Sequence, residues 1–194
     1  MSASLFRDLM PFRAFVAVAA PPQPGLVALL DELGSLGADL RCVMPENLHF
    51  TLAFLGDVPD GSEEPIAAAL HDAARGLAPS LAQLRGVGAF PSARRPRVVW
   101  VGVADPRPLV TLATRVREAL AAAGFRGDDK DFRAHLTLAR VRSDRGADKL
   151  AGFLRAHAQD EPGELAVREA TLYRSVLSPH GPTYEALARA PLGA

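Results

Sequence analysis

The sequence predicts an α+β fold, and two observations support that prediction. Segments with strand-like and helix-like patterns alternate along the 194 residues, and hairpin-like strand pairs interrupt this alternation twice. A doubly wound parallel sheet would show the alternation without the hairpins, so the pattern favours an α+β fold. Because no low-complexity linker divides the chain, we expect residues 1–194 to form a single domain.

The first half of the chain predicts two helices between extended segments. Both helical patterns end at a glycine, and the second begins with acidic residues that favour a helix N-terminus. The expected elements are a strand at 14–20, a helix at 25–37, extended structure at 40–58 that is broken at Pro45 and closed by Gly56, and a helix at 63–76.

The second half predicts two hairpins with a strand and two helices between them. A proline–arginine turn separates the strands of the first hairpin, and the segment "SPHGP" separates those of the second. The expected elements are strands at 81–90 and 97–103, a helix at 108–124, a strand at 133–142, a helix at 146–158 and strands at 163–179 and 183–192.

Composition excludes several classes of protein. Hydrophobic residues make up 48% of the chain, yet no apolar run reaches the roughly 18 to 20 residues of a membrane span. The net charge of zero provides no global field for nucleic acid. The lone Cys42 excludes an internal disulfide and a cysteine-rich metal site, so we expect a cytoplasmic protein.

One short motif occurs twice: "HFTL" at 49–52 returns as "HLTL" at 135–138. Side chains alternate between the two faces of a strand, so the histidine and threonine of each copy share one face and the apolar residues between and beside them share the other. Two such strands facing one another would bring together two imidazoles and two hydroxyls, those of His49, Thr51, His135 and Thr137.

This set of side chains suits general acid–base catalysis at a phosphodiester. A neutral histidine can take a proton from the attacking group while a protonated histidine gives one to the leaving oxygen. Imidazole allows both forms to coexist because its unperturbed pKa is about 6.5. Threonine hydroxyls can bind the non-bridging phosphate oxygens. A single His-x-Thr would more often be a packed strand histidine, and the repetition is what favours catalysis.

Three further histidines fall outside the motif. His71 and His157 lie in expected helices and are interpreted as surface or packing residues, and His180 lies in an expected turn and is interpreted as solvated. No acidic cluster accompanies His49 and His135 at the spacing of metal ligands. We therefore expect neither a metal nor another cofactor.

With these motifs, the sequence resembles the 2H phosphoesterases, which are defined by two H-x-[TS]-h motifs in which h is apolar. Within them it is similar to the bacterial and archaeal RNA 2′,3′-cyclic phosphodiesterases, also called 2′–5′ RNA ligases. One departure is Ala134, where that family commonly has a proline that shapes the backbone and does no chemistry. The resemblance spans nearly the whole chain and is carried by residues 15–21, 46–58, 95–103, 132–142 and 172–187.

The resemblance implies a bilobal fold with two antiparallel-sheet lobes, outer helices and a central active-site cleft. It also implies metal-independent hydrolysis of a 2′,3′-cyclic phosphate, on an RNA 3′ end or a nucleotide, to a 2′-phosphate, with 2′–5′ ligation as the reverse reaction. No membrane and no obligate protein partner are expected. The roles it implies are proton donor for His49, proton acceptor for His135, and phosphate binding for Thr51, Thr137 and Arg140.

The arginine assignment has an alternative. Arg140 is five residues beyond His135, so on a regular strand it would point to the opposite face, whereas Arg133 would share the face of His135. A bulge or the end of the strand could turn Arg140 back toward the histidines. The resemblance favours Arg140, and strand alternation favours Arg133.

Two other functions remain open from the sequence. The motifs contact a phosphate and no base, so a 2H phosphoesterase acting on 2′–5′ oligoadenylates or other small cyclic nucleotides would carry the same residues. A non-catalytic protein that binds RNA ends is the alternative from another class. Binding alone would call for cations more than for titrating histidines, which favours the enzyme.

Overall fold

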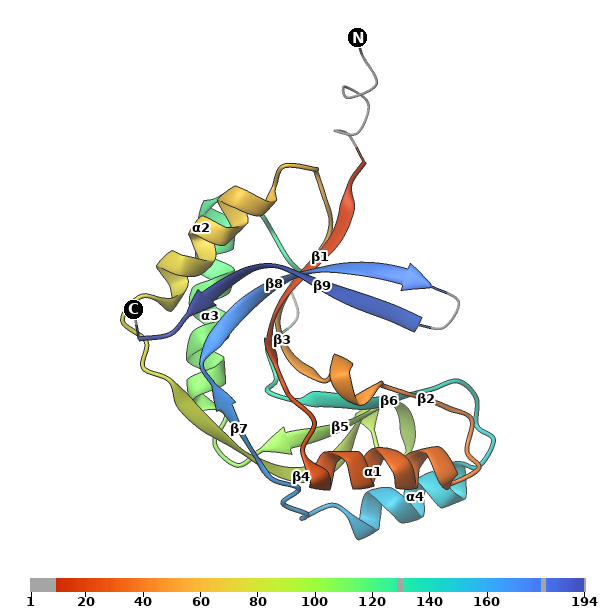
Figure 1. Ribbon diagram of the computed structural model, residues 1–194. Coiled ribbons are helices and arrows are strands. Elements are labelled where there is room, and N and C mark those ends of the chain that lie inside the picture. The colour runs from red at the N-terminus through yellow and green to blue at the C-terminus, as the bar shows by residue number, and fades with distance from the viewer. Residues whose placement is uncertain (1–9, 129–130, 179–180, 194) are drawn as a thin grey trace.

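The computed structural model describes residues 10–128, 131–178 and 181–193, which form two lobes of antiparallel strands with helices outside them (Figure 1). The elements are β1 (Phe12–Ala19), α1 (Pro24–Ser35), β2 (Leu40–Cys42), the 3₁₀ turn η1 (Pro45–Asn47), β3 (His49–Val58), α2 (Glu63–Ala74), β4 (Ser80–Ser92), β5 (Arg95–Val103), α3 (Arg107–Ala122), β6 (Leu136–Val141), α4 (Ala147–Ala156), β7 (Glu164–Val167), β8 (Glu169–Ser178) and β9 (Gly181–Pro191).

The strands form one continuous antiparallel ladder in the order β7-β4-β5-β6-β3-β1-β8-β9, and β2 pairs with β6. We call β3, β1, β8 and β9 lobe A, and β7, β4, β5, β6 and β2 lobe B. The lobes join where β3 meets β6, at the pair of Phe50 and Leu136. The expected bilobal α+β fold is confirmed.

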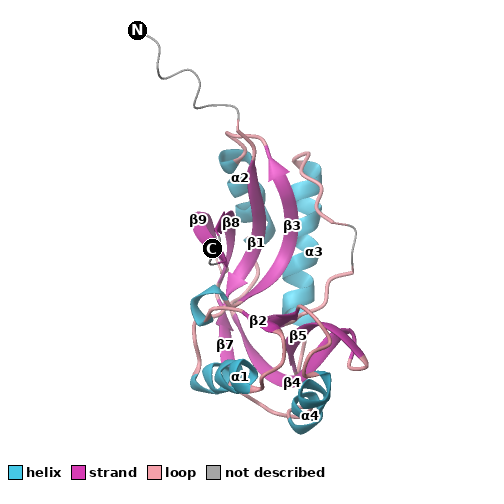
Figure 2. Cartoon of the chain, turned by 90° about the vertical axis from the view of Figure 1, so that its right-hand side faces the viewer, coloured by secondary structure: helices cyan, strands magenta, loops and turns pink. Residues whose placement is uncertain are grey.

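Helices cover the outer side of each lobe, α2 and α3 on lobe A and α1 and α4 on lobe B (Figures 1 and 2). Helix α1 follows β1 of lobe A but packs against β2 and β6 of lobe B. Helix α3 follows β5 of lobe B but packs against β3 of lobe A. Since each of these helices presents a stripe of buried apolar residues at helical spacing, the exchange ties the two lobes together.

Two details of the fold correct the sequence expectations. The segment 163–179, expected as one strand, contains two: β7 pairs with β4 in lobe B, and β8 pairs with β1 in lobe A. The ladder breaks at Arg168 because the chain crosses there from one lobe to the other. Gly56 does not close β3 but lies inside it with a φ of 69°, next to a register shift against β1. A positive φ at a bulge favours glycine.

The histidines outside the repeated motif are placed as follows. His71 is exposed on α2, and His180 lies outside the described residues. His157, directly after α4, hydrogen-bonds Asp160 (2.6 Å) and Glu32 of α1 (3.1 Å). It therefore packs the end of α4 against α1. No helix among the described residues is long and apolar enough to span a membrane.

Candidate active site

The residue pair that joins the lobes also brings the two motifs together. Phe50 and Leu136 are buried, with 1% and 0% of their surface exposed, and each directly follows a motif histidine. The residues before and after Phe50 and Leu136 point to the face of the sheet opposite their buried side chains, and we call that opposite face the site face. Because the strands are antiparallel, the residue before Phe50 lies opposite the residue after Leu136, and the reverse. His49 therefore lies across from Thr137, and Thr51 lies across from His135.

Both imidazoles are oriented by the same hydrogen bond. The Nδ1 of His49 lies 2.7 Å from the carbonyl oxygen of Asn47, and the Nδ1 of His135 lies 2.6 Å from that of Arg133. A carbonyl only accepts, so Nδ1 donates in both rings. The neutral ring then carries its lone pair on Nε2, and the protonated ring carries an acidic proton on Nε2. Either ring can therefore exchange a proton with a substrate through Nε2.

The carbonyl behind His49 is held by a local turn. Pro45 and Asn47 bound the 3₁₀ turn that leads into β3, and the Asn47 amide donates through Nδ2 to the Pro182 carbonyl on β9 (3.1 Å). His135 lies one residue before β6 begins, in an irregular segment rather than in the expected strand. The strand expectation was wrong there, and sequence reasoning missed Asn47, whose only signal was the turn-forming "PEN" before the motif.

His49 is the more enclosed of the two histidines. Its ring lies 4.9 Å from that of Phe15 and 5.3 Å from that of Tyr184, which stands perpendicular to it. Burial lowers the pKa of His49, the hydrogen bond to Asn47 opposes that shift, and the charges of His135 and Arg140 lower the pKa further. Tyr184 was not singled out in the sequence, and burial raises the pKa of its phenol.

His135 has a more open surrounding and a more cationic one. Its ring meets the edge of Phe90 at 5.0 Å, and the Arg133 guanidinium lies over the same Phe90 ring at 5.5 Å. Burial lowers the pKa of His135, the hydrogen bond to the Arg133 carbonyl opposes this, and the charges of Arg133 and Arg140 lower it further. Both histidines are therefore biased toward the neutral form in the absence of an anion.

A bulge in β6 resolves the alternation problem for Arg140. Val99 pairs with Ala139 and Trp100 pairs with Thr137, so β6 has one extra residue, Leu138, between them. The consecutive residues Leu138 and Ala139 are both fully buried. The extra residue shifts the alternation by one, which returns Arg140 to the site face.

The charges agree with this placement of the two arginines. Arg140 lowers the pKa of both motif histidines, whereas Arg133 acts on His135. Arg133 precedes the strand, so the alternation argument that favoured it does not apply. Arg140 is thus the cation that the two imidazoles share.

Two cavities of the described structure lie away from the motif histidines. A cavity of about 550 Å³ lies between α3 and the chain near Phe132, and one of about 630 Å³ lies between the β4–β5 hairpin and the start of α4. The motif histidines line neither. Within the described ranges, no group of three or more histidine, cysteine, aspartate or glutamate side chains could hold a metal ion.

The two-lobed fold and the paired histidines define a phosphoesterase of the two-histidine class. The chain belongs to the 2′-5′ RNA ligase superfamily, whose family model matches residues 21–178. This confirms the resemblance found in the sequence.

Several known proteins are similar over most of their length. The RNA 2′,3′-cyclic phosphodiesterases of Methanothermobacter thermautotrophicus and Archaeoglobus fulgidus are 39% and 40% identical, over 90% of this chain and 96% and 97% of theirs. A crystal structure of a protein from Thermus thermophilus superposes with a TM-score of 0.75 at 30% identity, covering 93% of this chain and 97% of that one. Escherichia coli LigT complexed with 3′-AMP gives 0.73 at 29% identity, covering 95% and 99%.

Proposed function

We propose that this protein is an RNA 2′,3′-cyclic phosphodiesterase that hydrolyses a terminal cyclic phosphate to a 2′-phosphate. The main support within the structure is the matched pair of Nδ1–carbonyl hydrogen bonds, because they leave Nε2 of both His49 and His135 to exchange protons. The names of the relatives, which are RNA 2′,3′-cyclic phosphodiesterases, support the same reaction.

In the proposed reaction, His135 acts as the base and His49 as the acid. Nε2 of His135 takes a proton from water as the water oxygen bonds to phosphorus, and the bond from phosphorus to the 3′ oxygen breaks. Nε2 of His49 gives its proton to that oxygen. The water and the leaving oxygen lie in line on opposite sides of phosphorus. The 2′ ester bond stays intact, so the product is a 2′-phosphate.

The surroundings of the histidines favour this division of roles. A base that activates water must be reached by water, and His135 is the more open ring. The acid is better protected from exchanging its proton with solvent, and His49 is enclosed by Phe15 and Tyr184. Binding of the anionic phosphodiester raises the pKa of both rings, which restores the proton that one of them must carry.

The remaining polar groups of the site face are proposed to bind the phosphate. The hydroxyls of Thr51 and Thr137 lie across from the two histidines and can donate to non-bridging oxygens. Arg140 supplies a fixed positive charge close to both rings. A cation held in place before the reaction stabilises the charge on the phosphoryl oxygens in the transition state.

The proposal extends to the setting of the reaction. The RNA 3′ end is taken as the substrate in the cytoplasm, without an obligate protein partner, and the two lobes are taken to fold as one domain. Hydrolysis of 2′–5′ oligoadenylates or other small nucleotides by the same groups is the second candidate, because the site residues contact phosphate rather than base.

The test is hydrolysis of adenosine 2′,3′-cyclic phosphate by the purified protein, with the product identified by chromatography against adenosine 2′-phosphate and 3′-phosphate standards. We expect the 2′-phosphate and full activity in EDTA. A 3′-phosphate product would show that the other ester bond breaks. Loss of activity in EDTA with recovery on adding a divalent ion would contradict a reaction by the two histidines alone.

A further inference from the structure

A second arginine lies beside Arg140 on the site face. Residues directly opposite one another in neighbouring strands point to the same face of a sheet. Strand pairing across lobe B gives the row Phe90–Val98–Arg140–Arg41, on β4, β5, β6 and β2. Phe90 at one end of the row touches the ring of His135, so the row lies on the site face. Arg41 is therefore the next side chain outward from Arg140.

Two arginines placed opposite one another repel. Like charges directly opposite in an antiparallel pair destabilise a sheet unless a counter-charge lies between them. In the parts of the chain that the structure describes, neither Arg41 nor Arg140 has a carboxylate within 4.0 Å, although several other arginines do. Both side chains are exposed, so solvent screens part of the repulsion, and a bound anionic group would relieve the rest.

Arg41 is placed differently from Arg140. It lies on the strand next to that of Arg140, a spacing of about 4.8 Å between backbones, along the edge of β6 that also pairs with β3. Arg140 is among the charges that lower the pKa of both histidines, and Arg41 is not. Its guanidinium extends to the start of β9, where a Cβ added to Gly181 would lie 3.2 Å from Nη2. Arg41 is exposed, so a ligand can reach it. The reacting phosphate at the histidines therefore leaves Arg41 for a second anionic group.

We propose that Arg41 binds the phosphate on the 5′ side of the terminal nucleotide, so that the enzyme prefers substrates with a second phosphate to nucleoside cyclic phosphates. In RNA that phosphate is always present, one nucleotide before the cyclic ester. The planar guanidinium matches a phosphate with two parallel hydrogen bonds. This inference rests on the proposed function and specifies its substrate class.

The experiment compares three substrates that differ stepwise. They are adenosine 2′,3′-cyclic phosphate, the same nucleotide with a 5′-phosphate, and the diadenylate that ends in a 2′,3′-cyclic phosphate. We expect the 5′-phosphate to lower the KM of the wild-type enzyme about tenfold with little change in kcat, because the added contact is made equally in ground and transition states. The gain should shrink as salt is raised.

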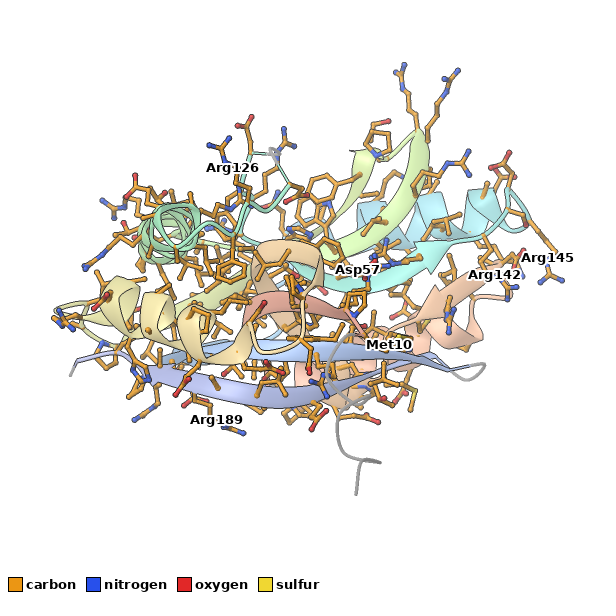
Figure 3. All side chains as sticks on the ribbon, turned by 90° about the horizontal axis from the view of Figure 1, so that it is seen from above. Met10, Asp57, Arg126, Arg142, Arg145 and Arg189 are labelled. Carbon is orange, nitrogen blue, oxygen red and sulfur yellow. The ribbon has the colours of Figure 1, made fainter. Side chains whose placement is uncertain are left out.

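In Arg41→Ala this gain should disappear, while hydrolysis of the nucleotide without a 5′-phosphate stays at the wild-type rate. Arg41→Lys should keep part of the gain, since it keeps the charge and loses the paired hydrogen bonds. Arg41→Gln provides a second removal of the charge if the alanine variant folds poorly. The matched control is Arg142→Ala, which removes an equal, exposed charge directly after the end of β6. Figure 3 shows where Arg142 lies, beside Arg145 and at the end of the molecule opposite Arg189.

The outcomes separate this inference from the proposed function. A wild-type enzyme inactive on all three substrates would overturn the proposed function itself. An active enzyme without the 5′-phosphate gain, or an Arg41→Ala variant that keeps it, would overturn the role of Arg41 alone. An equal loss on all three substrates would place Arg41 on the reacting phosphate instead. Loss of the gain in Arg142→Ala as well would assign it to the general field of the region.

Discussion

The two lobes present the same motif with a bulge at the same position of each copy, but with different chemistry around it. The copies are "HFTLAF" in lobe A and "HLTLAR" in lobe B, and the fourth residue of each forms a bulge. Leu52 is the extra residue opposite β1, and Leu138 is the extra residue opposite β5. Each bulge shifts the alternation by one and returns the sixth residue to the face of the histidine. That residue is Phe54 in lobe A and Arg140 in lobe B.

This difference separates the tasks of the two lobes. Lobe A surrounds its histidine with rings, since Phe15 stacks with Tyr173 at 5.2 Å and meets Tyr184 at 4.8 Å. Lobe B supplies Arg140, whose charge lowers the pKa of both histidines, and Arg41 opposite it on β2. The repeated motif thus presents two imidazoles with matched Nδ1–carbonyl hydrogen bonds, whereas the residues that differ between the repeats enclose the ring of His49 and place Arg140 in lobe B.

The largest expected effect is loss of either motif histidine. His49→Ala and His135→Ala should each lower kcat/KM by about 10²- to 10⁴-fold, because each removes one proton-transfer group. Steady-state kinetics on adenosine 2′,3′-cyclic phosphate measures this. His71→Ala is the matched control, since it removes an exposed imidazole from α2 and should leave the rate unchanged. Full activity in either motif variant would contradict the paired roles.

A smaller effect is expected from the two arginines. Arg140→Ala should lower kcat/KM by about 10²-fold, because the charge on the phosphate loses its fixed counter-charge. Arg133→Ala should cost only a few-fold, since Arg133 lies before β6 and acts on His135. The same kinetic assay compares the two variants. The reverse order would show that Arg133 is the phosphate ligand and that the bulge does not deliver Arg140 to the substrate.

The pH dependence should also distinguish the lobes. In the proposed reaction, free-enzyme kcat/KM requires neutral His135 and protonated His49, so it should fall below the pKa of the first and above the pKa of the second. Both pKa values are lowered from 6.5, so the maximum of kcat/KM should lie below pH 6.5. The bound phosphate raises both values and should move the kcat maximum to higher pH.

Arginine variants should shift the acid and alkaline limbs of the kcat/KM profile by different amounts. Arg140 lowers the pKa of both histidines, so Arg140→Ala should move both limbs of kcat/KM to higher pH. Arg133 acts on His135, so Arg133→Ala should move only the acid limb. A shift of the alkaline limb alone in Arg133→Ala would mean that His135 is the acid.

The smallest effect is on the stability of lobe B. Burial opposes protonation of His157, but the hydrogen bonds to Asp160 and Glu32 outweigh it and raise its pKa above 6.5. Its protonated form therefore stabilises the fold below pH 6.5, and this contribution is lost as the pH rises through the raised value. His157→Ala should lower Tm by a few degrees at pH 5.5 and less at pH 9. If the lobes form one domain, calorimetry should show a single transition that moves as a whole.

The sequence sufficed for the fold class and the family, because both follow from signals that are local in the chain. Hydrophobic periodicity marked the helices and strands, and the repeat of His49 and Thr51 at His135 and Thr137 identified the motif. These features do not depend on which strand pairs with which. Their catalytic roles remain the predictions stated above.

What the sequence could not predict depends on pairing between distant segments. The bulge at Leu138 exists only relative to β5, so the strand pattern of β6 alone pointed Arg140 the wrong way. The break at Arg168 appears because β7 and β8 pair in different lobes. Tyr184 and Arg41 carry no motif of their own and are placed by the pairing of β9 and β2, whereas Asn47 lies in the turn before β3 and is held there by Pro182 of β9.

The most direct test of the central claim, that His49 is the acid and His135 the base, uses a cyclic substrate whose bridging 3′ oxygen is replaced by sulfur. A thiolate, with a pKa of roughly 8.5 by analogy with cysteine, leaves without a proton donor. The kcat/KM of each alanine variant is measured on the oxygen and sulfur substrates. We predict that His49→Ala recovers most of its lost rate on sulfur and that His135→Ala does not. Rescue of His135→Ala alone would show that the roles are reversed, and equal rescue of both would contradict a dedicated acid and base.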